Sequence, residues 1–135
     1  MNKKFFISSA VVAFASLMLG FIIHAVLLQA DYTRLPALYR STTDSQAHFG
    51  YMLLAHVMIG FGMTWIYLRG REAGKSFMQQ GLRFGAAIAV VSTIPTFFIY
   101  FAVQPLPSDM VAQQIVYSTI GSLVLGIVTA WMNRS

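Results

Sequence analysis

The chain has no cysteine, and only 10% of its 135 residues are charged. Without cysteine there is no disulfide framework, no thiolate metal site and no cysteine nucleophile. Soluble domains carry about 25% charged residues, so this chain lacks the polar side chains needed to cover a water-facing surface. The sequence therefore argues against a soluble domain and against any fold held by disulfides.

Recognisable catalytic motifs are also missing. There is no glycine-rich phosphate loop, no G-x-S-x-G elbow and no H-E-x-x-H helix, so no motif favours an enzyme. The four carboxylates lie between the apolar runs or at their ends, which argues against a proton-coupled carrier of the usual kind. The net charge is +5, but the basic residues punctuate apolar runs and do not gather on a soluble face, so we expect no nucleic-acid partner.

What the sequence has in abundance is long apolar runs, since 57% of its residues are hydrophobic. About 20 apolar residues cross a bilayer as a helix. Runs of that length predict spans at about 5–28, 46–68, 78–103 and 109–132. The basic start before the first run is also typical of a signal peptide, but the apolar region of a signal peptide spans only about 7–15 residues. We therefore predict one all-α integral membrane domain over residues 1–135, with four transmembrane helices.

The longest polar segment, Gln29–Phe49, joins the first two spans. Within it, Leu35–Arg40 predicts a short helix lying in the membrane interface, and Asp44 is a predicted N-cap for the second span. In the third span Pro95 removes a helical hydrogen bond, so we expect a bend near Val91–Pro95. Ser108 or Asp109 is expected to cap the last span.

The distribution of lysine and arginine predicts the orientation. With the N-terminus inside, the inner side carries seven basic residues and the outer side only Arg34 and Arg40. The seven are Lys3, Lys4, Arg69, Arg71, Lys75, Arg83 and Arg134. By the positive-inside rule both termini face the cytoplasm, and the spans alternate in direction as an antiparallel bundle. The expected location is a plasma membrane, and the resemblance described below implies a bacterial inner membrane.

Small and polar residues recur at a spacing of four in each span. Membrane helices associate through such residues because they allow close approach. The stripes are Ser16, Gly20 and His24; His56, Gly60 and Thr64; Gly81, Gly85 and Ala89; and Ser118, Ser122, Gly126 and Ala130. They predict helix packing, and they specify no activity.

Two histidines lie inside predicted spans. At 1.5 Å per residue, His24 and His56 are expected at similar depth near the outer surface, with His48 at the interface above them. Ionisable residues inside a membrane are candidate functional residues. Several interpretations stay open: neutral imidazoles bonded to each other, to tyrosine or to a carbonyl; a metal site of His24, His48 and His56, with Asp31 or Asp44 nearby; axial ligation of a b-type haem; or a quinone or lipid pocket.

Basic residues outside the spans are candidate lipid or partner contacts. In the outer loop, Arg34 and Arg40 either pair with nearby carboxylates, each exposed pair contributing about 0–1 kcal/mol, or hold a lipid phosphate or a partner's acidic loop. The inner cluster is expected to anchor the topology and attract anionic lipid. It consists of Arg69, Arg71, Lys75 and Arg83.

From His24 to Arg134 the sequence resembles small four-span bacterial inner-membrane proteins of an uncharacterised family. The resemblance is carried by HAVLLQADYTRLPALYR, MLLAHVMIGFGMTWIYLRGREAG, GLRFG and YFAVQP. It implies the four-span fold, a bacterial origin and a single domain, and it implies no activity, cofactor or site.

Three functions follow as hypotheses. The first is a non-enzymatic accessory or interaction subunit of an inner-membrane complex, or a small homo-oligomer, whose partners are membrane lipids, other membrane subunits or itself. The alternative is a redox or ligand-binding protein with a haem, metal or quinone site near His24 and His56. The second alternative is a small transporter, for which the only pointer is the proline in the third span.

Overall fold

The structure is a computed structural model, and it describes residues 1–134. This part of the chain is helical and contains no strand. Its elements are α1 (Lys3–Gly20), the π-helical turn η1 (Phe21–Leu27), α2 (Gln29–Thr33), α3 (Thr42–Ala47), α4 (Phe49–Gly70), α5 (Phe77–Ile88), the π-helical turn η2 (Ala89–Thr93), α6 (Ile94–Val103) and α7 (Ser108–Met132).

Four helical segments are long and apolar enough to cross a membrane: Lys3–Leu27, Phe49–Gly70, Phe77–Val103 and Ser108–Met132. The prediction of an all-helical chain with four candidate spans is therefore confirmed.

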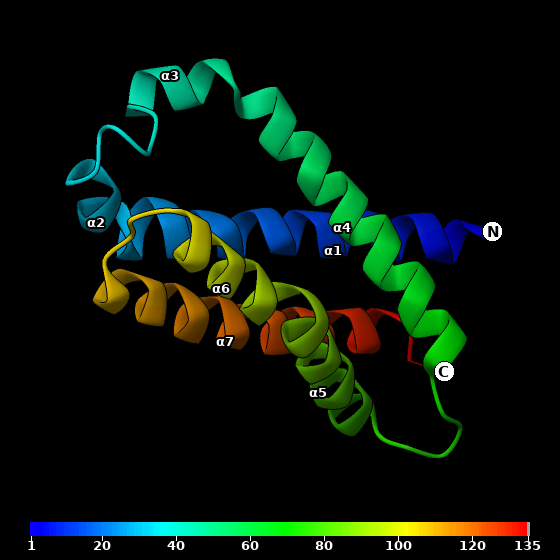
Figure 1. Ribbon diagram of the computed structural model, residues 1–135. Helices are drawn as coiled ribbons and strands as arrows, with labels where there is room; N and C mark the ends of the chain where they lie inside the picture. Colours follow the sequence, from blue (N-terminus) through cyan, green and yellow to red (C-terminus); the bar gives the residue numbers. More distant parts are fainter. Residues whose placement is uncertain (135) are drawn as a thin grey trace.

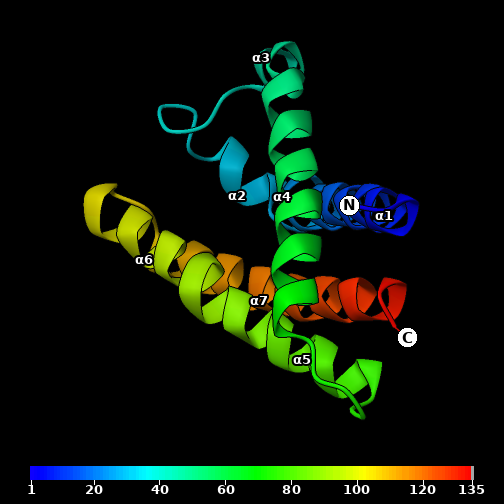
Figure 2. The same cartoon turned by 90° about the vertical axis from the view of Figure 1, so that its right-hand side faces the viewer.

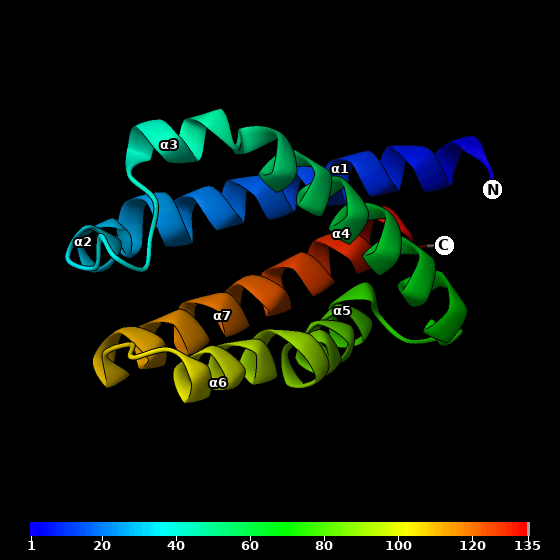
Figure 3. The same ribbon diagram turned by 45° about the horizontal axis from the view of Figure 1, so that its top comes forward.

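The helices pack as two pairs. α4 packs on α1, α5 packs on α7, and the contact between α1 and α7 joins the pairs. α1 and α7 lie side by side, and both chain termini lie at one end of the molecule (Figures 1 and 3). α4 crosses α1 at a steep angle, so that its first half and α3 stand away from the other helices (Figure 2). We call the end with both termini the termini end, and the opposite end the α2 end.

The α1–α4 contact is built on a glycine. A Cβ atom at Gly60 would lie 2.7 Å from the backbone nitrogen of Ala13, so only glycine allows this approach of the two helices. Beside it, the buried side chains of Val12 and Met63 form a small core with Leu125 of α7. The glycine of the second predicted stripe thus lies at a helix contact.

In the α5–α7 contact, glycines meet from both sides. A Cβ at Gly85 would lie 2.7 Å from the Cα of Leu123, and one at Gly126 would lie 2.6 Å from the backbone nitrogen of Gly85. Gly81 makes a similar approach, 2.6 Å from the Cα of Ile127. Backbone packs on backbone here, and the predicted glycine stripes of the third and fourth spans account for it.

Two long helical segments contain π-helical turns. At the end of η1, the N–H of Leu28 donates to the carbonyl of Ile23, five residues earlier, at 2.9 Å. In η2, the N–H of Ile94 donates to the carbonyl of Ala89 in the same way. Pro95 follows at the start of α6, where a missing N–H is tolerated. The direction of the helix changes at η2 (Figure 1), within the segment where the sequence predicted a bend.

The first connection differs from its prediction. Residues 35–40 form turns, closed by N–H groups of Leu38 and Tyr39 that donate to the carbonyl of Leu35 at 3.0 Å, and the predicted interfacial helix is wrong. Helices flank these turns instead. After the turns, the Ser41 hydroxyl accepts the N–H of Asp44 at 3.2 Å and caps α3.

The predicted caps of two spans also differ. Asp44 lies in the first turn of α3, and α4 begins after a break at His48, whose φ and ψ are −105° and 11°. In the last connection the N-cap position is Pro107, without a side-chain bond, and Ser108 is already helical. Neither span begins with the side-chain cap that the sequence predicted.

Candidate functional site

His24 belongs to a hydrogen-bonded network at the α2 end. Its Nδ1 lies 2.6 Å from the hydroxyl of Tyr32, and the rings stack with centroids 5.9 Å apart. The Gln114 amide donates to the same hydroxyl at 3.3 Å. The Tyr32 hydroxyl therefore bonds to both His24 and Gln114, which connects η1, α2 and α7. A contact between His24 and a tyrosine is one of the arrangements that the sequence left open.

His56 has a separate partner. Its Nδ1 lies 2.6 Å from the hydroxyl of Ser16 on α1. Its ring lies over Gly20, where a Cβ atom would come within 3.2 Å of the imidazole Cε1. The predicted stripes supply all three residues of this contact, Ser16, Gly20 and His56. They therefore make a polar contact between α1 and α4 as well as an apolar one.

The two imidazoles lie at different levels along α1. Ser16 precedes His24 by eight residues, about 12 Å of helix, and His56 reaches only to the Ser16–Gly20 level. Both rings use Nδ1, and within residues 1–134 neither Nε2 makes a hydrogen bond.

His48 is not part of this arrangement. Its Nδ1 lies 2.8 Å from the carbonyl oxygen of Asp44 and its ring stacks beside Tyr51. Among residues 1–134 no three His, Asp or Glu side chains form a group of the kind that holds a metal ion. The structure thus leaves His48 apart from His24 and His56.

Tyr32 and Gln114 are site residues that the sequence analysis missed. Gln114 is only 4% exposed, and its Oε1 is a buried acceptor without a hydrogen-bond partner among the described residues. Burial raises the pKa of the Tyr32 hydroxyl above its ordinary value. The signal in the sequence was a glutamine inside an apolar run, because placing its amide there costs free energy unless the amide is hydrogen-bonded.

The two arginines of the first connection are paired locally. Arg34 forms an ion pair with Asp31, and Arg40 donates to Asp44 at 2.9 Å. Both arginine side chains remain more than half exposed. Pairing with neighbouring carboxylates was one of the two interpretations that the sequence left open.

The four basic residues of the cluster at the termini end make three kinds of contact. Arg69 stacks over Trp65, 4.9 Å from the ring centroid, and Arg71 donates to the carbonyl of Asn133 at 3.0 Å. Lys75 and Arg83 both contact the Glu72 carboxylate at 2.6 Å. The hydrogen bond from Lys75, which has the larger effect, and the one from Arg83 lower the pKa of Glu72 below its ordinary value. The Glu72 carboxylate is therefore ionised at neutral pH.

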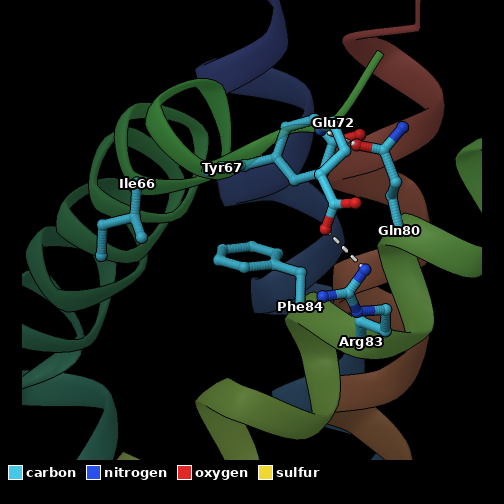
Figure 4. Close-up of a pocket in the computed structure, with 7 residues that line it drawn as sticks. Ile66, Tyr67, Glu72, Gln80, Arg83 and Phe84 are labelled. Atoms are coloured by element: carbon cyan, nitrogen blue, oxygen red, sulfur yellow. Dashed lines mark hydrogen bonds and ion pairs between the residues drawn. The ribbon is translucent and has the colours of Figure 1, made fainter. Parts of the chain in front are cut away.

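A pocket of about 210 Å³ lies beside that ion pair (Figure 4). Its apolar wall comes from Ile66 and Tyr67 at the end of α4 and from Phe84 on α5. Its polar rim consists of Glu72, Gln80 and Arg83. The Gln80 side chain fixes the rim, since its oxygen accepts the N–H of Glu72 at 2.7 Å and its amide donates to the carbonyl of Lys75 at 3.0 Å.

The first half of α4 has an uncovered surface. Every residue from Phe49 to Ile59 is exposed or half-buried, and Gly60 is the first buried residue of the helix. Within this half, Leu54 and Met58 are 57% and 66% exposed. Added Cβ atoms at Gly50 and Gly62 would meet nothing within 4 Å. We call Gly50, Leu54, Met58 and Gly62, which recur every four residues, the open face of α4.

No family model, curated protein or solved structure matches this chain. The resemblance to small four-span bacterial proteins stays a prediction.

Proposed function

We propose that this chain is a non-enzymatic interaction subunit of the bacterial inner membrane, which associates with another membrane protein or with copies of itself. The observation that carries the proposal is the open face of α4. Residues Phe49–Ile59 of this candidate span bury no side chain, as is also true of residues 90–103, but only the face on α4 carries glycines with open space beside them. Glycines with free space beside them allow a second helix to approach such a face closely.

The polar contacts of the chain agree with this role. The charged side chains of both connections are engaged with neighbouring carboxylates, an aromatic ring or a carbonyl, and they do not converge on a reacting centre. Salt bridges of exposed side chains contribute little to stability. They hold the connections in shape, and the apolar helix faces are left for association.

The proposed topology is an antiparallel bundle with both termini in the cytoplasm. Seven of the nine lysines and arginines fall on the side of the termini in this orientation, as the positive-inside rule requires. The location of both chain ends at one end of the molecule supports it (Figure 1).

Native mass spectrometry tests the association. The protein is extracted from its own membranes in mild detergent, and we expect assemblies heavier than the 15.0 kDa chain. Met58→Lys, which charges the open face, should reduce these assemblies, whereas Val90→Lys, at a 68% exposed position on η2, should leave them intact. A chain that is always monomeric and free of any partner would contradict the proposal.

A second candidate function is ligand or redox binding at His24 and His56. It is favoured by the bonding of each Nδ1 to a hydroxyl, because a histidine that ligates through one ring nitrogen is commonly held in place through the other. An absorption spectrum and metal analysis of the purified protein decide between the two functions. A haem band or bound metal that the His24→Ala, His56→Ala double variant loses would support it. A colourless, metal-free protein whose double variant behaves as the parent chain would reject it.

A further inference from the structure

The pocket beside the Glu72–Arg83 ion pair lies at the termini end, between the last turn of α4, residues 71–76 and the second turn of α5 (Figure 4). It lies where two candidate spans end, Phe49–Gly70 and Phe77–Val103. In a membrane this is the level of the phospholipid headgroups.

The chemistry of the pocket is divided in two. Its wall of Ile66, Tyr67 and Phe84 is apolar, and the rings of Tyr67 and Phe84 pack edge to face with centroids 5.5 Å apart. Its rim presents the Arg83 guanidinium, which is 62% exposed although it is paired with Glu72. A ligand that suits both parts has an anionic head and an apolar tail.

The charges around the pocket add up to an excess of positive sign. Arg69, Arg71, Lys75 and Arg83 contribute four positive charges, and Glu72 contributes one negative charge, so the balance is three positive. Arginine binds phosphate oxygens in a planar, bidentate manner. Anionic lipids of the cytoplasmic leaflet are attracted to basic segments of this kind.

We propose that this pocket binds the phosphate of an anionic phospholipid, with Arg83 as the principal ligand and with an acyl chain along Ile66 and Phe84. Glu72 acts as an internal competitor: its carboxylate occupies the guanidinium of Arg83, 2.6 Å away, until the phosphate replaces it. The released carboxylate keeps its contact with Lys75.

The test is native mass spectrometry of the detergent-purified full chain, titrated with phosphatidylglycerol. We expect Arg83→Gln to weaken lipid binding about tenfold, the size of one lost charge-assisted hydrogen bond. Glu72→Gln should tighten it, because nothing then competes for Arg83. If the ion pair had only a structural role, Arg83→Gln and Glu72→Gln would change lipid binding in the same direction. Arg83→Lys, which keeps the charge, should recover part of the affinity and controls for misfolding.

Arg69→Gln is the matched control, since Arg69 lies in the same cluster but contacts Trp65 and does not line the pocket. Its effect should be less than twofold, and an equal loss in both arginine variants would mean unspecific attraction and overturn the proposal. Binding of phosphatidylcholine as tight as that of phosphatidylglycerol, or displacement of the lipid by equimolar inorganic phosphate, would overturn it too. The same spectra report the oligomeric state, so failure here is distinguishable from failure of the proposed interaction role.

Discussion

At the scale of single residues, each intramembrane histidine is held by one hydroxyl. Tyr32 bridges His24 and Gln114, and Ser16 holds His56. A polar group that is buried away from water without a hydrogen bond costs free energy. The bonds to these hydroxyls reduce that cost for the two histidines within the candidate spans. The bonds also fix the orientation of both rings through Nδ1.

The bridging role of Tyr32 predicts a stability effect. Tyr32→Phe removes the acceptor for the buried Gln114 amide and should lower the free energy of unfolding by about 1–3 kcal/mol. Tyr39→Phe is the control. The ring centroids of Tyr39 and Tyr32 lie 4.5 Å apart, but the Tyr39 hydroxyl makes no hydrogen bond within residues 1–134. Denaturation in mixed detergent micelles measures both. Equal losses of stability in the two variants would show that the Tyr32 hydroxyl contributes no more than the Tyr39 hydroxyl.

The close approach of α5 and α7 gives a second prediction. Alanine is normally the better helix former, yet Gly126→Ala should destabilise the protein by about 1–3 kcal/mol because its Cβ would overlap the backbone of Gly85. Gly62→Ala, with open space around it in the single chain, should be neutral or slightly stabilising for the unfolding of the monomer. Thermal unfolding of the two variants side by side checks this. A stable Gly126→Ala protein would mean that the helices are farther apart than described.

These residues differ in how far sequence alone could identify them. The sequence alone could identify Gly60, Gly85 and Gly126, because each recurs with other small residues at a spacing of four within its own helix. A pattern inside a single helix is visible without knowledge of the fold. The bond between Tyr32 and Gln114 joins positions 82 residues apart. Such a partner depends on how α2 lies against α7, which no local pattern encodes.

At the scale of elements, the four candidate spans followed from run length alone, because the bilayer thickness fixes how long an apolar helix must be. The first connection did not follow in this way. Leu35–Arg40 has a helix-like start, but the Ser41 cap begins α3 after it, and the competition between two weak signals decided the outcome. The π-helical turns also left no clear sequence signal, apart from Pro95 after the second.

Pro95 gives a prediction for its own helix. In Pro95→Ala, the new N–H can donate to the carbonyl of Val91, and the clash of the ring with that carbonyl disappears. Hydrogen exchange of the amides from 91 to 94 should therefore slow about fivefold, the effect of one backbone hydrogen bond of about 1 kcal/mol. Pro107→Ala, just before α7, should leave these amides unchanged. Unchanged exchange in Pro95→Ala would show that η2 does not depend on the proline.

At the scale of the whole molecule, the helices form two closely packed pairs, and the first turns of α4 extend beyond its contact with α1 (Figure 2). Length and composition predicted the number of candidate spans. They could not predict that α4 would cross α1, because the crossing angle depends on which small residues meet, here Gly60 against Ala13. The same crossing separates the two histidines and exposes the open face.

The proposed topology predicts labelling from one side only. The natural chain has no cysteine, so single cysteines report their own position. In intact cells a membrane-impermeant maleimide should label Ser45→Cys in α3, whereas Ala73→Cys, in the connection after α4, should react only after the membrane is opened. Labelling in the reverse order would invert the orientation and move the basic pocket to the outer leaflet.

The interaction role is tested most directly by photo-crosslinking through the open face of α4. A photoreactive phenylalanine analogue replaces Met58, and in a second protein it replaces Val90, which is equally exposed but lies on η2. After irradiation of intact membranes, we expect a discrete adduct heavier than the 15.0 kDa chain at position 58 and none at position 90. Mass spectrometry of that adduct identifies the partner as a second copy or another protein. If position 58 crosslinks to lipid alone, as position 90 does, the interaction role is contradicted.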